Sequence, residues 1–312
     1  MTTPSKVIAA PDAVAFIGLG QMGLPMARNL AAAGFEVRGY DVTPSARDAY
    51  VAAGGQVTQS LQQAVDGAAA AILMLPNGAI VRSLLQDPGV VSAIAAANTL
   101  VIDMSSSAPF GTAALGQELA AKAVRLIDAP VSGGVKRARE GKLAIMVGGD
   151  DASIDAARHL FEALGNSVFP TGPLGSAHAM KALNNFVSSA GLVAAAEALI
   201  IGGRFGLQPE VIVDVLNASS GRNNATEVKM KQFVLSGAYN SGFGLALMSK
   251  DVTTAAELSH DLGMKLPSLE LMAGLWAQAS RTLAGPRDHT EIYRYLEAAS
   301  GEVADGPSVT AD

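Results

Sequence analysis

The sequence predicts an α/β protein in which an N-terminal Rossmann-type, doubly wound parallel sheet is followed by an all-α C-terminal domain. Short apolar runs alternate with helical patterns through the first half of the chain, and a glycine-rich turn follows the first run. After about residue 176 only helical patterns remain. Near-continuous apolar strands that alternate with helices are typical of a parallel sheet covered on both faces. We expect residues 1–175 to form the α/β domain and residues 176–312 the helical one.

The first strand, helix and second strand form one βαβ unit. Residues 14–17 are the apolar first strand, a glycine turn follows directly, and a helical pattern runs to Gly34. The second strand, 37–40, ends at Asp41. Three spaced glycines permit a tight turn, close approach of a pyrophosphate and close packing of helix on strand, while the helix N-terminus attracts the diphosphate. We therefore predict that a dinucleotide binds at Gly18, Leu19, Gly20, Gln21, Met22, Gly23 and Asp41, rather than that these residues form a mere turn beside a surface acid.

Asp41 also bears on which dinucleotide binds. Its carboxylate can accept hydrogen bonds from a ribose diol and would repel a 2′-phosphate. No arginine follows it directly, and Arg47 lies further along the chain. The sequence therefore predicts NAD as the cofactor and disfavours NADP.

Further strands are predicted at 69–75, 99–103, 124–128 and 142–147, and polar or glycine-rich segments end three of them. Each segment alone is explained by ordinary turn chemistry. Ligands of such sheets bind at the carboxyl ends of the strands, so together these segments are better explained as cofactor and substrate loops. The residues are Leu75, Pro76 and Asn77; Ser105, Ser106 and Ser107; and Ser132, Gly133 and Gly134.

Composition narrows the possible partners. The formal charge is −6 and there is no basic run, which argues against nucleic acid and a membrane surface. There is no cysteine and the four histidines are scattered, so no metal site is predicted. The longest apolar stretch, about 186–203, contains Glu197, and the N-terminus lacks an apolar signal segment. We expect a buried helix there and a cytoplasmic protein.

The stretch "GPLGSAHAMKALNN", residues 172–185, introduces polar groups at the start of that apolar helix. Lys181 and Asn185 are four residues apart and share one helix face. The helix begins where two domains join, and such junctions form clefts, in which a lysine can exchange a proton with an alcohol oxygen. Spacing alone also allows Lys181 to extend to solvent and the asparagines to cap backbone groups. His178 and Asn184 stay undecided between support and surface.

The chain resembles the β-hydroxyacid dehydrogenases, the group of 3-hydroxyisobutyrate, tartronate-semialdehyde and related short-acid enzymes. Four segments carry the resemblance in the family's order: "FIGLGQMGLPMARNL", "DAPVSGG", "GPLGSAHAMKALNN" and "FGLALMSKD". It covers about residues 13–300. The resemblance implies hydride transfer between a short hydroxy-carboxylic acid and NAD without a metal, and a homodimer or homotetramer formed through the helical domain.

The resemblance also implies roles for individual residues. Lys181 would be the general acid/base and Asn185 would orient the substrate hydroxyl. Ser132, Gly133 and Gly134 would bind the substrate carboxylate. The implied cofactor contacts are the glycine turn, Leu75, Pro76, Ser106 beside the nicotinamide, Phe243 and Lys250.

The sequence departs from the family pattern at two places. Lys136 and Arg137 stand where the family often has small residues, and either could read an extra group of the substrate or be a solvated helix residue. Arg222 and Asn223 are candidate specificity residues. Two other functions stay open from the sequence: an imine reductase on the same scaffold, whose members usually lack this lysine, and a dinucleotide-binding module without catalysis.

Overall fold

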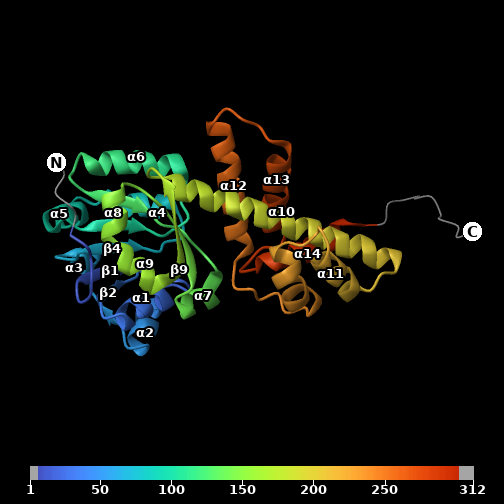
Figure 1. Ribbon diagram of the computed structural model, residues 1–312, viewed down its shortest axis with the longest axis horizontal. Coiled ribbons are helices and arrows are strands. Elements are labelled where there is room, and N and C mark those ends of the chain that lie inside the picture. Colours follow the sequence, from blue (N-terminus) through green and yellow to red (C-terminus); the bar gives the residue numbers. More distant parts are fainter. Residues whose placement is uncertain (1–5, 302–312) are drawn as a thin grey trace, which may run out of the picture. The chain divides into compact units, whose positions relative to one another are not determined.

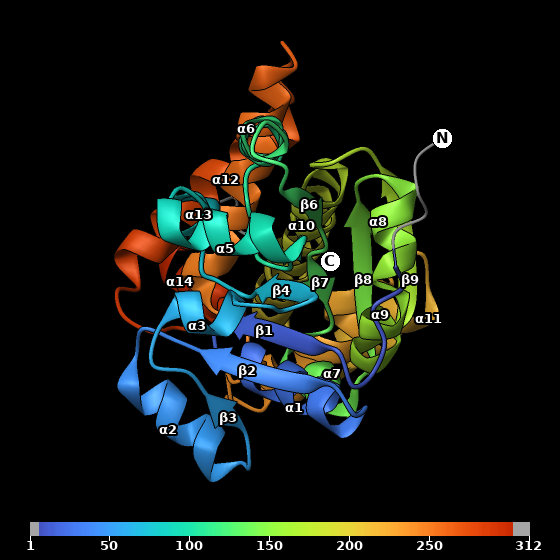
Figure 2. The same ribbon diagram turned by 90° about the vertical axis from the view of Figure 1, so that its left-hand side faces the viewer.

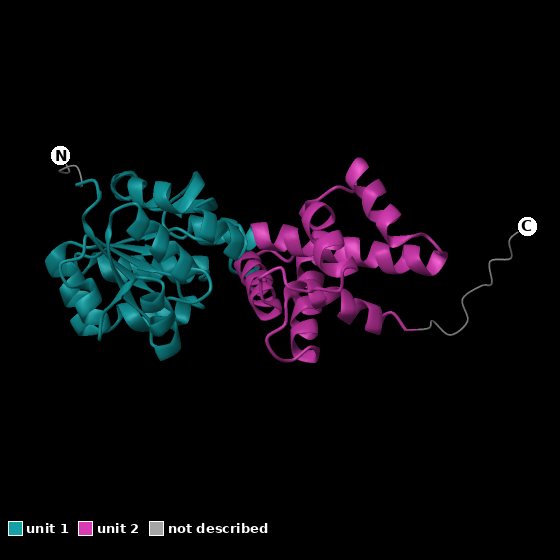
Figure 3. Cartoon of the chain, turned by 90° about the horizontal axis from the view of Figure 1, so that it is seen from below, with its two compact units in different colours: residues 1–183, 260–262 teal, residues 184–259, 263–312 magenta. Residues whose placement is uncertain are grey.

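A computed structural model describes residues 6–301, which divide into two units (Figure 3). The first unit runs up to Leu183 and includes His260–Leu262, and the second contains Asn184–Ser259 and the residues from Gly263 onward. Helix α10, Ser176–Phe205, begins in the first unit and ends in the second. The sequence prediction places the domain boundary where this helix begins, whereas the two units divide within the helix, between Leu183 and Asn184.

The first unit is built on a nine-stranded sheet (Figure 2). The strand order is β3-β2-β1-β4-β5-β6-β8-β7, with β9 paired to β8. β1 is parallel to both β2 and β4, so the chain proceeds to one side of β1 and then to the other, which makes a topological switch point. The strands are β1 Ala13–Ile17, β2 Glu36–Tyr40, β3 Gln56–Val57, β4 Ala70–Leu73, β5 Leu100–Asp103, β6 Arg125–Asp128, β7 Val131–Ser132, β8 Leu143–Gly148 and β9 Gly165–Gly172.

Helices cover both faces of this sheet (Figure 1). Successive residues of β1 point into different cores: Val14 and Phe16 pack with α1, α7, α8 and α9, while Ala15 and Ile17 pack with α3 to α6. Burial on both faces explains why the strands are apolar throughout. The helices are α1 Gly23–Ala32, α2 Pro44–Ala52, α3 Leu61–Val65, α4 Gly78–Leu85, α5 Pro88–Ala97, α6 Pro109–Ala120, α7 Gly134–Glu140, α8 Asp151–Ala156 and α9 Arg158–Leu164.

The sheet differs from the sequence prediction at its far edge. The four further strands predicted from apolar runs are present as β4, β5, β6 and β8, but β8 is antiparallel to β6 and β7. An apolar run has the same composition in either strand direction, so the pattern could not reveal this. The sequence also missed β9, which is mostly exposed and contains Pro170. Both features are typical of an edge strand, where apolar patterning is weak.

The second unit is helical, as predicted. In residues 184–301, β pairing is limited to an isolated bridge between Gly244 and Asp288. Trp276 is fully buried there. The elements are α11 Pro209–Ala218, the π-helix η1 Ala225–Leu235, α12 Leu245–Asp261, α13 Pro267–Thr282, the 3₁₀ turn η2 His289–Glu291 and α14 Ile292–Ala299.

Helix α10 is long and apolar enough to cross a membrane by length and composition alone. The core helix of a soluble protein passes the same test. Leu192, Val193 and Ala196 of α10 are buried, and Glu197 lies beside them in sequence. A charge in mid-span is costly in lipid, so we keep the prediction of a core helix.

The loops before α12 and η2 are held together by one carboxylate. Asp288 accepts hydrogen bonds from Ser241 Oγ, the Gly242 backbone N–H, and both the backbone N–H and the hydroxyl of Thr290, at 2.6–2.9 Å. Burial by itself would raise the pKa of Asp288, but hydrogen bonds from His289 and Thr290 outweigh it and hold the pKa well below 3.8. The ionised carboxylate therefore stabilises the second unit.

Replacing Asp288 by asparagine should lower the free energy of unfolding at pH 7 by about 1.5–3 kcal/mol, because hydrogen bonds to a charged group are lost. The folded pKa is depressed, so this stability is fully present above pH 3.8 and is lost as pH falls through the folded pKa. The difference in the free energy of unfolding between D288N and the parent should therefore shrink below about pH 4. Urea denaturation at several pH values measures this difference in the free energy of unfolding. Glu257→Gln, at an exposed position of α12, is the matched control, and an equal loss in both variants would contradict the assignment.

Candidate active site

The glycine turn after β1 has the backbone that its three glycines predict. Gly18 has a φ of 99°, and a Cβ there would overlap the carbonyl oxygen of Met74. A Cβ on Gly23 would overlap the carbonyl oxygen of Gly18, so glycine is needed for α1 to pack on the turn. Gly20 is exposed, and a Cβ there would meet no atom within 4 Å. Space is therefore open where a diphosphate would approach the backbone.

Asp41 lies directly against this turn. Its Oδ2 accepts a hydrogen bond from the Leu19 backbone N–H at 2.8 Å, and its Oδ1 accepts one from the Thr43 backbone N–H at 2.8 Å. Each carboxylate oxygen has a second lone pair, so both remain able to accept from a ribose diol. Arg47 is closer than its place in the sequence suggested, because its guanidinium donates to the Asp41 carbonyl oxygen at 2.6 Å. The end of β2 thus combines a fixed carboxylate with an adjacent cation.

The serine segment after β5 is tied to the end of β4. Ser105 Oγ accepts from the Leu75 backbone N–H at 2.9 Å, and Ser107 Oγ donates to Asp103 at 3.0 Å. Ser105 and Ser107 are buried, whereas Ser106 between them is only partly buried. Ser106 is therefore the least buried serine of this segment, and its place beside the nicotinamide stays a prediction.

Ser132 ends β7, and Gly133 and Gly134 lead into α7. Both glycines have positive φ values, 133° and 68°. A Cβ on Gly133 would lie 2.7 Å from Cδ of Arg137, so the arginine stem packs over this glycine. A Cβ on Gly134 would meet no atom within 4 Å. The backbone of this turn is therefore open to a small anionic ligand, while Arg137 and Lys136 are themselves exposed.

The start of α10 is anchored on the carboxyl end of β6. Asp128, the last residue of β6, accepts hydrogen bonds from the backbone N–H groups of Gly175 and His178, both at 2.8 Å. These bonds satisfy donors that a helix N-terminus leaves without partners. Ser176 is the first residue of this helix. Burial raises the pKa of Asp128, and His178 and the backbone hydrogen bonds oppose the rise.

His178 is a supporting residue. Its side chain is fully buried, with Nδ1 2.9 Å from Thr112 Oγ1 and Nε2 3.1 Å from the carbonyl oxygen of Ser105. A carbonyl oxygen only accepts, so Nε2 carries a proton. His178 thereby joins α10 to α6 and to the serine segment. The sequence left open whether His178 supports the site or lies on the surface, and its burial excludes a surface position.

Lys181 is buried, with 8% of its surface exposed, one turn beyond this anchor. The alternative in which its ammonium extends freely to solvent does not hold. It belongs to the same unit as the glycine turn, Ser106 and Ser132. A buried ammonium in the unit that would hold a dinucleotide is the arrangement that proton exchange with a substrate oxygen requires.

Asn185 is buried in the second unit and is held by its neighbours. Its Nδ2 donates to Asp251 at 2.6 Å, and its Oδ1 accepts from Asn184 Nδ2 at 3.1 Å. Asp251 also pairs with Lys250 at 3.0 Å. The role of Asn184, which the sequence left open, is therefore to orient Asn185. The second N–H of the Asn185 amide can still donate to a ligand.

Comparisons with known proteins agree with this geometry. Residues 13–172 match the family described as the NAD binding domain of 6-phosphogluconate dehydrogenase, and residues 175–296 match the one described as NAD-binding of NADP-dependent 3-hydroxyisobutyrate dehydrogenase. The chain is 33% identical to 2-(hydroxymethyl)glutarate dehydrogenase of Eubacterium barkeri, covering 94% of this chain and 97% of the relative. It is 36% identical to NAD-dependent L-serine dehydrogenase of Pseudomonas aeruginosa, covering 93% and 99%. The chain belongs to the β-hydroxyacid dehydrogenase family.

A solved structure supports the same family. Mycobacterium tuberculosis 3-hydroxyisobutyrate dehydrogenase with L-serine is 32% identical, with a TM-score of 0.83, over 91% of this chain and 99% of that one. As a β-hydroxyacid dehydrogenase, the protein is an oxidoreductase that acts on CH–OH groups with a nicotinamide dinucleotide. The non-catalytic module considered from the sequence is therefore not supported.

Some predicted site residues of this dehydrogenase have local structural contacts. Asn77 Oδ1 caps α4 by accepting from the Ile80 N–H at 3.0 Å, and Asn223 Oδ1 accepts from the Ala225 N–H at 2.8 Å. Arg222 is exposed and lies 3.7 Å from Glu227. Phe243 makes an edge-to-face contact with His289. The ligand roles of these residues stay predictions.

Sequence reasoning missed three acidic residues, each of which holds neighbouring residues within its own unit. Asp103 and Asp128 each end a buried strand, and Asp251 follows Lys250 in the late family motif. A carboxylate at the end of an apolar strand is a signal that could have been used, because a buried charge needs hydrogen-bond donors. Which donors it finds depends on the tertiary structure.

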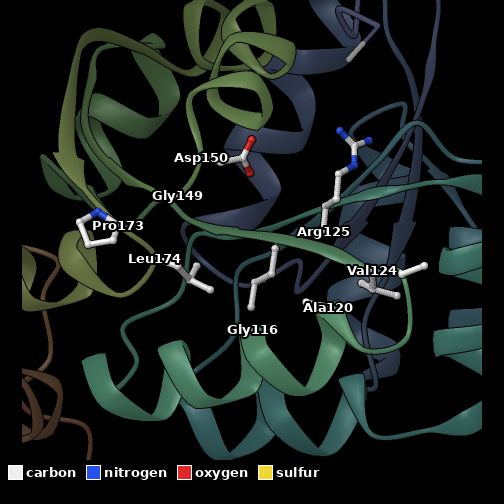
Figure 4. A pocket seen from close by; sticks show the side chains of 10 residues that line it. Gly116, Ala120, Val124, Arg125, Gly149, Asp150, Pro173 and Leu174 are labelled. Atoms are coloured by element: carbon white, nitrogen blue, oxygen red, sulfur yellow. The ribbon is translucent and has the colours of Figure 1, made fainter. Parts of the chain in front are cut away.

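A pocket of about 560 Å³ in the first unit lies elsewhere (Figure 4). Arg125 and Asp150 are among its lining residues, and none of the predicted site residues is. Arg125 begins β6, so the pocket lies at the amino end of that strand, whereas ligands of such sheets bind at the carboxyl ends. We do not assign the active site to it. In residues 6–301 no group of three or more His, Asp or Glu side chains is arranged to hold a metal ion.

The contrast between Gly20 and Gly23 gives a test of dinucleotide binding. Gly20→Ala should leave thermal stability nearly unchanged, because the new Cβ meets no atom, but should weaken NADH binding about 10-fold or more by obstructing the diphosphate. Gly23→Ala should lower the melting temperature, because its Cβ overlaps the Gly18 carbonyl. Thermal unfolding and NADH fluorescence titration measure both. Unchanged NADH affinity in G20A would contradict this placement of the diphosphate.

Proposed function

We propose that the protein transfers a hydride between a short hydroxy-carboxylic acid and NAD, with Lys181 as the general acid/base and without a metal. The observation that carries the proposal is the Asp128 anchor, because it fixes the start of α10 and therefore buried Lys181 at the carboxyl edge of the sheet. Ligands of doubly wound sheets bind at that edge.

The substrate class follows from the chemistry that the relatives' names share. 2-(Hydroxymethyl)glutarate, L-serine and 3-hydroxyisobutyrate each have a CH₂OH group on the carbon that bears the carboxylate. We propose that this chain acts on the same HOCH₂–CH(R)–COO⁻ unit. The R group then distinguishes one substrate from another.

Residues of this chain supply the proton transfer and the orientation of the substrate. The nicotinamide, when bound, accepts the hydride from the carbinol carbon or returns it. In oxidation, neutral Lys181 Nζ removes the hydroxyl proton as the C–H bond breaks, which leaves an aldehyde; in reduction, protonated Lys181 returns the proton to the oxygen. Backbone N–H groups of Ser132–Gly134 hold the carboxylate, and this orientation contributes to the rate. The Asn185 amide, held by Asp251, orients the hydroxyl.

Lys181→Ala should lower kcat by about 10²–10⁴-fold, the usual contribution of a positioned acid/base, and leave the Kd for NADH within about 2-fold. Absorbance of NADH with a panel of hydroxymethyl acids measures turnover. Lys122→Ala removes an exposed lysine and is the matched control. Turnover near the parent level in K181A would reject the assignment, and absence of turnover by the parent on every acid of the panel would reject the substrate class.

We further propose NAD over NADP, because the Asp41 carboxylate would repel a 2′-phosphate. The Arg47 guanidinium beside it can pair with that phosphate once the carboxylate is removed. Asp41→Asn should therefore lower the ratio of kcat/KM for NADH to that for NADPH by about 10-fold or more. In the double variant D41N/R47Q, kcat/KM for NADPH should fall back from the higher value expected for D41N. An unchanged ratio in D41N would show that specificity is set elsewhere.

A further inference from the structure

The pocket of about 560 Å³ in the first unit combines two opposite charges with an apolar lining (Figure 4). Arg125 and Asp150 are the charged residues among those that line it. The other lining residues have no polar side-chain atom and are glycines, alanines, a proline, Val124, Leu126 and Leu174. Small-molecule sites are typically apolar cavities of this size with a few polar groups that fix the orientation of the ligand. The lining thus has the composition of a ligand site.

The apolar part of the pocket is formed by packed residues. Val124 and Leu126, on either side of the first residue of β6, are 3% and 8% exposed. Leu174 lies against α6, because a Cβ on Gly116 would overlap its Cδ2. Glycine at this position therefore lets the leucine side chain approach the helix closely. All the lining residues belong to the first unit, so the shape of the pocket depends on that unit alone.

Asp150 can offer one carboxylate oxygen to a ligand. Its Oδ1 accepts a hydrogen bond from the Ser153 backbone N–H at 2.9 Å and so caps α8. Within residues 6–301 the Asp150 carboxylate forms no ion pair, and its Oδ2 accepts no hydrogen bond. The cap holds the side chain in one orientation, and the other oxygen can accept hydrogen bonds from an ammonium group.

Arg125 is held by the end of α5. Its Nη2 donates to the carbonyl oxygen of Asn98, the residue that follows α5, at 3.0 Å. A guanidinium has five N–H donors in a planar fork, so it can bind a carboxylate while it keeps other acceptors. Arg125 is only partly exposed and already oriented. Less side-chain entropy is therefore lost when a carboxylate binds than at a fully exposed arginine.

The two charges line one pocket without forming an ion pair with each other. Figure 4 shows the Arg125 and Asp150 side chains at one side of the pocket and those of Val124 and Leu174 at the other. A simple anion would be repelled by Asp150, and a simple amine would be repelled by Arg125. A molecule that carries both charges on neighbouring atoms matches both residues, and an apolar remainder can cover the rest of the lining.

We propose that this pocket binds an aliphatic α-amino acid. The carboxylate of the amino acid contacts Arg125, its ammonium group contacts Asp150, and its side chain packs on Val124, Leu126 and Leu174. The pocket is separate from the candidate active site, since none of the predicted site residues lines it. The inference therefore does not depend on the proposed hydride transfer.

Calorimetric titration of the NADH-bound full chain tests the site with three probes that share one apolar group. L-Leucine carries both charges, 4-methylpentanoate lacks the ammonium group, and 3-methylbutylamine lacks the carboxylate. The parent should bind L-leucine more tightly than either of the other two. Asp150→Asn, which keeps the helix cap, should weaken L-leucine binding about 5- to 10-fold and make it equal to that of 4-methylpentanoate. Arg125→Gln should likewise reduce the affinity for L-leucine to that for 3-methylbutylamine.

Three further variants show whether L-leucine binds in this pocket. Asp151→Asn and Arg158→Gln change exposed residues that do not line the pocket, and both should bind L-leucine as the parent does. Ala120→Phe places an aromatic ring in the pocket and should abolish binding. Ala120 is exposed, so this variant should fold.

Failure of the parent to bind L-leucine at about 10 mM, or equal affinity for all three probes, would overturn the inference. Unchanged L-leucine affinity in D150N and A120F would also overturn it, because the amino acid would then bind elsewhere on the protein. If R125Q does not fold, these two variants and the comparison of probes on the parent still decide the outcome. Turnover of hydroxy acids tests the proposed function separately.

Discussion

The interaction on which the candidate site depends is the Asp128 carboxylate at the end of β6. It accepts the backbone N–H groups of Gly175 and His178, and so it joins the central sheet to the first turn of α10. Helix N-termini leave such donors without partners, and a buried carboxylate needs donors, so each group satisfies the other. Lys181 lies one turn further along the same helix, and its position follows from this junction.

Buried polar residues extend the junction in both directions. His178 connects α10 to Thr112 of α6 and to the serine segment after β5, whose Ser105 and Ser107 side chains are used internally. In the second unit, Asp251 and Asn184 hold Asn185 in the same way. Polar networks of this kind are stable only when their members are satisfied. The side chains proposed for chemistry are thus oriented by neighbours that have no part in it.

Glycine has two opposite uses in the turns of the candidate site. At Gly18 and Gly23 it permits packing, because a Cβ would overlap backbone atoms of the protein itself. At Gly20 and Gly134 it leaves open space, where a ligand can approach backbone N–H groups. The same residue type therefore serves the fold at some positions and binding at others, and the local packing tells the two apart.

The sequence by itself determined the six longer apolar strands of the α/β unit, the glycine turn with Asp41, the helical second unit and the family, because these depend on local spacing and periodicity. It could not determine the direction of β8, the edge strand β9 or the π-helical η1, since an apolar run reads alike in either direction and tertiary contacts select helix type. Only the tertiary structure decided that His178 supports the site, that Arg47 adjoins Asp41 and that Lys229 donates to Ser188. Each of these depends on which distant residues come within hydrogen-bond distance, and spacing along one chain does not contain that information.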